Sequence, residues 1–195
     1  MSTTQRLVYD DSLYHIIQKG NNGQKIFKDD EDFETFLLLI SRYLNKFKVE
    51  VYHFCLMPTH IHLLLKIFEK KVLAKFMQGI LQSYRFSHKR KYTYEGYLYK
   101  GRYRSKLVAK DEYLLECGRY IERNPVRAGI TKDPYEYKWS SCSYYTHGRT
   151  NGIITEDLLY YTFGNDLRQC QRRYTEYVSM SRPYEEIMDK EFNIQ

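Results

Sequence analysis

Two histidines in one apolar segment have a spacing that suits metal binding. His60 and His62 open the run HIHLLLKI, whose composition favours a β-strand. Residues two apart on a strand face the same side, so the two imidazoles would lie together while Ile61 points into the core. Imidazole nitrogens are common ligands of divalent metals. The alternative is a pair of histidines that only pack within the strand.

A tyrosine and an asparagine later in the chain form a second pair. Tyr120 and Asn124 are four residues apart in the segment RYIERNP, which is typical of a helix. Residues at this spacing lie on one helix face. A tyrosine hydroxyl can act as a nucleophile, and an asparagine carbonyl can supply an oxygen ligand to a metal. The four residues therefore outline a metal-assisted nucleophilic site.

The elements that must position these residues alternate between strands and helices. Strand patterns occupy residues 12–19, 49–57, 60–67 and 104–109, and helical patterns occupy residues 33–47 and 70–91. The order β-α-β-β-α-β predicts an α+β fold with a ferredoxin-like (RRM-like) antiparallel sheet and two helices on one face. We expect the other face of the sheet to be free for a ligand.

A third helix should follow the fourth strand and carry Tyr120. We expect it to run from Asp111 to Asn124, because Pro125 cannot donate a backbone hydrogen bond. Polar residues 147–152 are typical of a linker, and helical patterns follow at 156–163 and 166–180. The sequence thus predicts a principal domain, residues 1–145, and a small helical C-terminal extension of unknown role, residues 146–195.

Positive charge is concentrated in one stretch. The 195-residue chain has 31 Lys and Arg against 24 Asp and Glu, for a net charge of +7. Residues 85–106 contain eight of these cations and a single acid, Glu95, so this stretch alone carries +7, together with five of the 21 tyrosines. Cations interleaved with rings on which bases can stack favour a nucleic-acid partner. The alternative is a solvated helix face followed by a loop.

The rest of the composition excludes several classes of protein. Hydrophobic residues make up 43% and charged residues 28%, which excludes collagen-like and wholly disordered chains. The four scattered cysteines form no CxxC motif, so we expect neither a zinc ribbon nor a disulfide framework. No apolar run is long enough to cross a bilayer, and residues 1–11 lack the apolar core of a signal peptide. We therefore expect a cytoplasmic protein with no membrane partner.

Five motifs, in order, resemble those of one enzyme family. CLMPTHIHLL at 55–64 resembles the His-hydrophobic-His motif of single-tyrosine HUH transposases (IS200-like), and RYIERNPVRAG at 119–129 resembles their catalytic-helix motif. YHIIQKGNN at 14–22, YKGRY at 99–103 and WSS at 139–141 resemble the branch called REP-associated tyrosine transposases. The resemblance covers residues 12–145 and implies that residues 1–145 form a catalytic domain.

The resemblance implies an activity and a role for each site residue. By similarity, His60, His62 and Asn124 would hold a divalent metal, Mg²⁺ or Mn²⁺, and Tyr120 would attack a DNA phosphate to leave a 5′-phosphotyrosine link. The expected function is DNA transposition or recombination, in which single-stranded, hairpin-associated DNA is nicked and rejoined. A domesticated, non-catalytic module that binds single-stranded nucleic acid is the alternative, and a homodimer is an open expectation.

We expect the DNA contacts to come from the basic stretch and its surroundings. The candidate DNA-binding residues are Lys89, Arg90, Lys91, Lys100, Arg102, Arg104, Lys106, Asn21 and Arg127. For Arg127, a structural salt bridge is an equal alternative. Of the other histidines, His15 is a candidate supporting partner of the metal ligands, and the position of His53 is more typical of a packed or solvated side chain.

Overall fold

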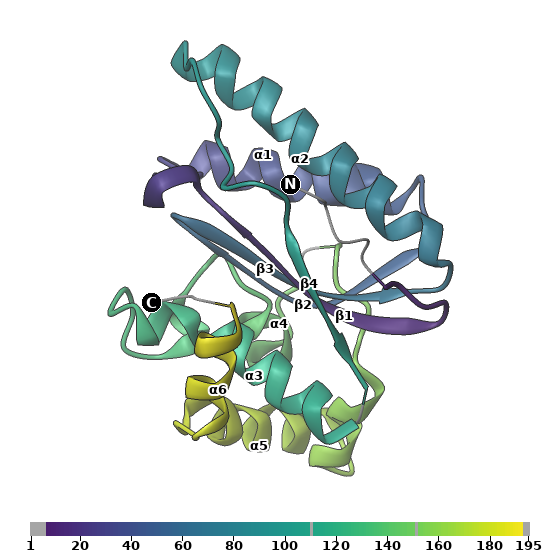
Figure 1. Cartoon of the computed structure of the whole chain (residues 1–195). Coiled ribbons are helices and arrows are strands. Elements are labelled where there is room, and N and C mark those ends of the chain that lie inside the picture. Colours follow the sequence, from purple (N-terminus) through teal and green to yellow (C-terminus); the bar gives the residue numbers. More distant parts are fainter. Residues whose placement is uncertain (1–6, 110, 151, 193–195) are drawn as a thin grey trace.

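The centre of the molecule is a four-stranded antiparallel sheet with the strand order β2-β3-β1-β4 (Figure 1). The computed structural model describes residues 7–109, 111–150 and 152–192. The strands are β1 (Ser12–Lys19), β2 (Val49–Met57), β3 (His60–Ile67) and β4 (Arg104–Val108). This is the ferredoxin-like arrangement that the alternating elements predicted, and β2 and β3 form the expected hairpin.

Two long helices cover one face of the sheet. They are α1 (Asp30–Leu44) and α2 (Lys70–Tyr92), which lie above the sheet in Figure 1. The Asp29 side chain accepts the backbone N–H of Asp32 at 3.1 Å and caps α1, and three acids in the first turn complement the helix dipole. Alternate residues of β3, such as Leu63 and Leu65, join the apolar stripes of both helices in the main core.

The other face of the sheet is covered, contrary to the expectation of a free face. The helix α3 (Asp111–Arg127) packs across it. The helix α4 (Cys142–His147) contacts β2 directly, and α5 (Leu167–Ser179) and α6 (Tyr184–Phe192) pack against α3 (Figure 1). Two short 3-10 helices, η2 (Pro134–Glu136) and η3 (Leu158–Phe163), complete this layer. The sequence pattern missed this because it does not specify where the helices after β4 pack.

Helix α3 continues three residues beyond its predicted end, through Pro125 to Arg127. Pro125 has no N–H to donate to the carbonyl of Ile121, one helical turn earlier. The side-chain amide of Asn124 donates to that carbonyl at 3.2 Å and to the Tyr120 carbonyl at 2.9 Å. The amide therefore replaces the missing backbone donor, and the helix runs through the proline.

The C-terminal part of the chain packs as a second, smaller core against the first. Tyr145, Tyr160 and Tyr174 are buried there with Cys142, Cys170 and Val178. The backbone of Ile154 bridges Val51 of β2, so this part is joined to the sheet. The expected helices at 156–163 and 166–180 are observed as η3 and α5, whereas α6 was not predicted. The predicted domain boundary at 145/146 falls inside α4.

Two findings concern the expectations from composition. All four cysteines are free and buried, with no disulfide. Among the described helices, none is both long and apolar enough to cross a membrane.

Candidate active site

The two histidines of the predicted pair lie side by side on the face of the sheet that α3 covers. His60 is opposite Lys19 and His62 is opposite Ile17 in the register of β1 and β3. The two imidazole rings have centroids 4.9 Å apart. The ring of Tyr120 lies edge-on to the ring of His62, with centroids 5.8 Å apart. The structure therefore brings β3 and α3 together as the two residue pairs require.

Each histidine of the pair uses one ring nitrogen for support and presents the other. His15 Nε2 lies 3.0 Å from His62 Nδ1, and Thr59 Oγ1 lies 3.1 Å from His60 Nδ1. His15, the candidate supporting partner, therefore orients His62. The Nε2 atoms of His60 and His62 are buried and have no hydrogen-bond partner among the described residues.

Burial keeps these imidazoles uncharged near neutral pH. It lowers the pKa of His15 to about 3 and that of His60 to about 4, and it also lowers the pKa of His62. Neighbouring cations, Lys106 for His15 and Lys19 for His60, act in the same direction. A neutral imidazole keeps the lone pair that a metal needs, so the site is prepared for a cation without loss of a proton.

Asn124 completes a donor set that fits a divalent metal. Because its amide NH₂ group bonds two helix carbonyls, its carbonyl oxygen is left as an acceptor. Among the described residues there is no group of three or more His, Cys, Asp or Glu that could hold a metal. Two imidazoles and one amide are a different donor set, and the two buried Nε2 atoms without partners are the observation that supports it.

The hydroxyl of Tyr120 is buried and held by the C-terminal helix. It donates to Asp189 Oδ1 of α6 at 3.1 Å, and Tyr120 is 0% exposed. The guanidinium of Arg127 lies 5.3 Å from the Tyr120 ring centroid and is paired with Asp189. Burial and the Asp189 charge raise the pKa of Tyr120 well above its usual value, and Arg127 opposes this shift. The Tyr120 hydroxyl is therefore protonated and covered in this conformation.

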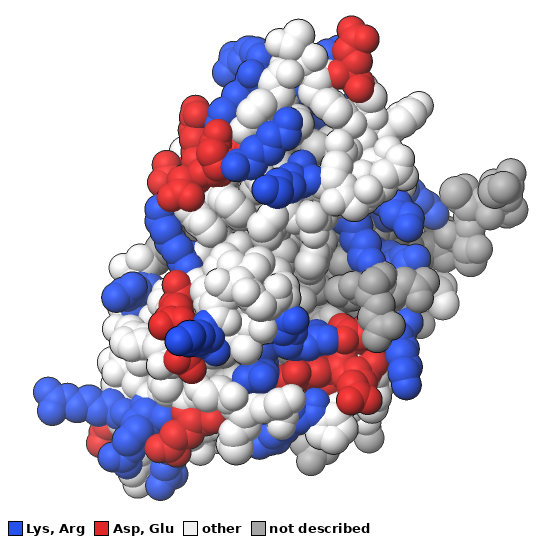
Figure 2. All heavy atoms as spheres, turned by 90° about the vertical axis from the view of Figure 1, so that its left-hand side faces the viewer, with Lys and Arg blue, Asp and Glu red and all other residues white. Residues whose placement is uncertain are grey.

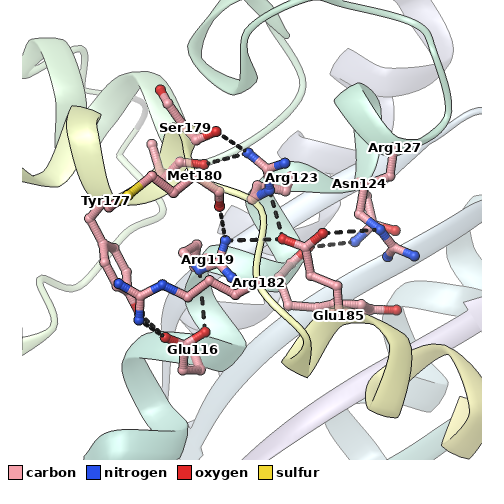
Figure 3. Close-up of polar contacts among 12 residues, drawn as sticks. Glu116, Arg119, Arg123, Asn124, Arg127, Tyr177, Ser179, Met180, Arg182 and Glu185 are labelled. Carbon is pink, nitrogen blue, oxygen red and sulfur yellow. Dashed lines mark hydrogen bonds and ion pairs between the residues drawn. The ribbon is translucent and has the colours of Figure 1, made fainter.

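A row of arginines on α3 forms ion pairs that hold α6 against α3. Arg119, Arg123 and Arg127 are four residues apart, and all three point toward Glu185 of α6 in Figure 3. Glu185 pairs with Arg119 at 3.0 Å, with Arg123 at 2.7 Å and with Arg127 at 3.5 Å. The salt-bridge alternative for Arg127 is thus what the structure shows. The acids of α6 were missed from the sequence, although the arginine spacing was a signal for an acidic partner.

The predicted DNA-binding residues fall into two groups on different layers. Lys89, Arg90 and Lys91 end α2, on the far side of the sheet from α3 (Figure 1). Within this group, Lys91 is paired with Asp29 at 2.7 Å and with Asp32 at 3.1 Å. The role of all three in DNA binding stays a prediction.

The second group lies beside the histidine pair. Lys100 donates its backbone N–H to the carbonyl of Lys19 at 2.9 Å, and Lys19 is the residue opposite His60. Burial and then the charges of Lys100 and Arg104 lower the pKa of Lys19, so both cations act on Lys19. Lys19 was not predicted. Lys106 lies on β4 opposite His15, Arg102 precedes that strand, and Asn21 lies in the turn after β1. On the face of the molecule drawn in Figure 2, Lys and Arg side chains surround a largely uncharged central area.

A buried polar network fastens α3 to the sheet. Glu122 of α3 accepts His53 Nδ1 at 2.8 Å, Ser141 Oγ at 2.5 Å and the Tyr174 hydroxyl at 2.9 Å. A β-bulge between Val51 and His53 places His53 on the face of the sheet toward α3. A Cβ at Gly118 would come within 2.7 Å of the His53 ring, so the close approach of the helix requires glycine there. The network fixes the helix that carries Tyr120.

Because of this network, we expect the free energy of unfolding to depend on pH. Burial alone would lower the pKa of His53, but Glu122 and Asp157 outweigh it and raise the pKa to about 9. A folded-state pKa above the unfolded value of about 6.5 means that the stabilisation is complete below pH 6.5 and is lost as the pH rises through 9. Urea unfolding across this range should therefore show a steeper fall in stability for the wild type than for His53→Gln. Equal slopes would show that His53 is neutral in the folded protein.

The fold and the site together describe a nuclease-like arrangement: a ferredoxin-like sheet that presents a histidine pair to a tyrosine on a covering helix. The sequence pattern of the family described as "Transposase IS200 like" matches residues 8–124. The chain therefore belongs to the IS200-like transposase family, which implies a DNA endonuclease and strand-transferase activity. A comparison with curated proteins finds no match.

Two solved structures are similar to this chain. One is described as a REP-associated tyrosine transposase bound to a REP hairpin; it is 14% identical, with a TM-score of 0.65, and the match covers 81% of this chain and 93% of that one. Another, a putative transposase from Deinococcus radiodurans, is 18% identical, with a TM-score of 0.43, over 63% of this chain and 97% of that one. At 14% identity the first match supports the fold.

Proposed function

We propose that this transposase nicks and rejoins single-stranded DNA next to hairpins, with Tyr120 as the nucleophile and His60, His62 and Asn124 as the ligands of a divalent metal. The observation that carries the proposal is the placement of the Tyr120 ring against His62, beside two buried imidazole nitrogens with no other described partner. A protein that only binds DNA needs neither a neutral histidine pair nor a tyrosine beside it.

The proposed reaction exchanges one phosphoester for another. The Tyr120 oxygen attacks the scissile phosphorus and loses its proton, the bond from phosphorus to the 3′ oxygen breaks, and that oxygen takes up a proton. The products are a 5′-phosphotyrosine link and a free 3′-OH. Attack by another 3′-OH reverses the step and joins two strands without ATP, since the ester is conserved. When bound, Mg²⁺ or Mn²⁺ would polarise the phosphate and stabilise the leaving oxygen.

The chain's own residues would prepare each part of this reaction. His15 and Thr59 orient the two histidines, and the Glu122 network fixes α3. Arg127, beside the Tyr120 ring, favours the phenolate and thus the loss of the proton. These groups all come from one chain, so the proposed site is complete without a second copy. The homodimer stays a prediction, which light scattering can check.

DNA binding is proposed to centre on the cations next to the histidine pair. Lys100, Arg102, Arg104 and Lys106 lie on or before β4, the neighbour of β1. Cations there can hold the phosphates of a strand that reaches Tyr120. The similar solved structure was bound to a REP hairpin, which supports hairpin DNA as the substrate to test. Lys89, Arg90 and Lys91 would contact a more distant part of the DNA, such as the stem.

The test is the capture of a covalent adduct on hairpin DNA. Hairpins with randomised single-stranded flanks are incubated with the protein and Mn²⁺ or Mg²⁺, and protein–DNA bands that resist denaturation are sequenced. We expect an adduct that requires the metal, with the DNA attached to the peptide containing Tyr120. The double variant His60→Ala/His62→Ala should bind DNA yet form no adduct. Tight DNA binding without an adduct in either metal would instead favour the non-catalytic binding module.

A further inference from the structure

A hollow at the end of the sheet is not explained by the catalytic residues. It lies where the turn after β1 meets α2 and the segment that leads into β4, and its volume is about 490 Å³. That volume falls within the range of roughly 300–1,000 Å³ that small-ligand sites occupy. Its lining residues are Asn21, Arg85, Tyr97, Leu98, Tyr99 and Gly101. None of these lining residues is acidic.

The hollow is held by backbone hydrogen bonds between segments far apart in sequence. The N–H of Asn21 donates to the carbonyl of Leu98 at 3.0 Å, and the backbones of Gly20 and Tyr99 form a bridge. The side-chain amide of Gln24 donates to the carbonyls of Tyr97 at 2.8 Å and Leu98 at 3.0 Å. The Tyr99 hydroxyl donates to the α2 carbonyl of Leu81 at 3.2 Å, which fixes its ring. The hollow is therefore formed before any ligand binds.

The side chains of the hollow have the chemistry that recognises a nucleobase. Tyr97 is 75% exposed, although it is a large aromatic residue, and its ring is available for stacking. Asn21 makes no side-chain hydrogen bond among the described residues, and its amide can both donate and accept at a base edge. Arg85 has no ion-pair partner among the described residues, and Leu98 supplies an apolar wall.

A run of positive charge connects the hollow with the candidate active site. Lys19 precedes Gly20 and is opposite His60, while Lys100 follows Tyr99 and bonds the Lys19 carbonyl. Arg104 lies opposite Ile17 on the neighbouring strand and lowers the pKa of Lys19 by its charge. A DNA backbone that crosses these cations would extend from the histidine pair to the hollow. The hollow is therefore placed to receive a nucleotide of the strand that Tyr120 attacks.

We propose that this hollow binds one unpaired base of the substrate strand, with Tyr97 stacking on the base, Asn21 reading its edge and Arg85 holding an adjacent phosphate. The proposal rests on the proposed function, since it takes the ligand to be single-stranded DNA. It adds a specificity site that is separate from the residues that break the bond. Sequence preference would then be read by the turn after β1 and the segment before β4.

The test couples a change in the protein to a change in the DNA. A hairpin recovered from the adduct experiment is prepared with one abasic nucleotide at each flank position in turn, and binding is measured by fluorescence anisotropy. We expect wild-type affinity to fall about tenfold at one position, as stacking on a single base predicts. Tyr97→Ala should show the same loss on intact DNA and no further loss at that position. A 2-aminopurine placed there should be quenched by the wild type and much less by Tyr97→Ala.

Matched variants separate this site from general loss of binding. Tyr161→Ala removes a tyrosine that is 47% exposed on η3, and Arg42→Ala removes a cation of α1; both should bind like the wild type. Asn21→Ala should relax the base preference at the coupled position more than it weakens binding. If the wild type forms the adduct but no position is coupled to Tyr97, the hollow is not a base site and the proposed function stands. If the wild type binds no hairpin DNA, both proposals fail.

Discussion

Replacing Tyr120 with phenylalanine is expected to abolish the covalent protein–DNA adduct, with a loss of at least about a thousandfold in the rate of cleavage. Phenylalanine keeps the ring that packs against His15 and His62, so only the attacking oxygen is removed. Water does not replace the oxygen, because the site is buried and is arranged around the tyrosine hydroxyl. DNA binding should be unchanged, since Tyr120 is 0% exposed and contributes no charge to a DNA surface.

The measurement is adduct formation in denaturing gels, with anisotropy on the same hairpin as the readout of binding. Tyr145→Phe is the matched control, because it removes another buried tyrosine hydroxyl. That hydroxyl donates to the Tyr52 carbonyl at 2.8 Å and makes no hydrogen bond to His60 or His62 among the described residues. It should cleave like the wild type. Cleavage by Tyr120→Phe at the wild-type rate would assign the nucleophile to another residue and overturn the proposed mechanism.

The sequence predicted the parts of this site that depend on local spacing. Two-residue spacing placed His60 and His62 on one face of β3, and four-residue spacing placed Tyr120 and Asn124 on one face of α3. Both follow from the geometry of a single element, which the pattern of apolar residues reveals. The order of elements then specified the sheet, because few topologies connect β-α-β-β-α-β without crossing chains.

The contacts between distant elements could not be predicted in the same way. The basic stretch 85–106 is one run in sequence, but its members lie in different elements: Lys89, Arg90 and Lys91 are in the last turn of α2, whereas Arg104 and Lys106 lie on β4. Lys91 is neutralised by Asp29, the cap of α1, and by Asp32 in its first turn, which are 59 or more residues away. A charge pattern in the sequence predicts which residues need an oppositely charged partner, but it does not predict which residue becomes that partner.

Releasing α6 from α3 is expected to increase adduct formation by about ten- to a hundredfold. In the structure, Tyr120 is 0% exposed. The Glu185 carboxylate pairs with arginines of α3, and the Asp189 carboxylate accepts the Tyr120 hydroxyl next to the proposed metal ligands. A DNA phosphate carries the same charge as these carboxylates and cannot approach Tyr120 while they are in place. The helix must therefore move before the proposed reaction can start.

The double variant Glu185→Gln/Asp189→Asn removes both charges and keeps the size of the side chains. Charge-assisted hydrogen bonds contribute roughly 1.5–3 kcal/mol each, so losing part of two such contacts accounts for the expected increase. The rate of adduct formation at saturating DNA is the measurement, and thermal unfolding shows that the variant is folded.

Glu186→Gln is the matched control, because this exposed acid lies on the same helix and makes no ion pair among the described residues. It should react at the wild-type rate. A chain ended after Ser181 removes α6 altogether and provides an independent test, which should also react faster than the wild type. If the folded double variant and the shortened chain both react no faster than the wild type, α6 does not restrict access to Tyr120. In that case the better interpretation of the contact between Tyr120 and Asp189 is that the Asp189 carboxylate accepts the Tyr120 proton as a general base.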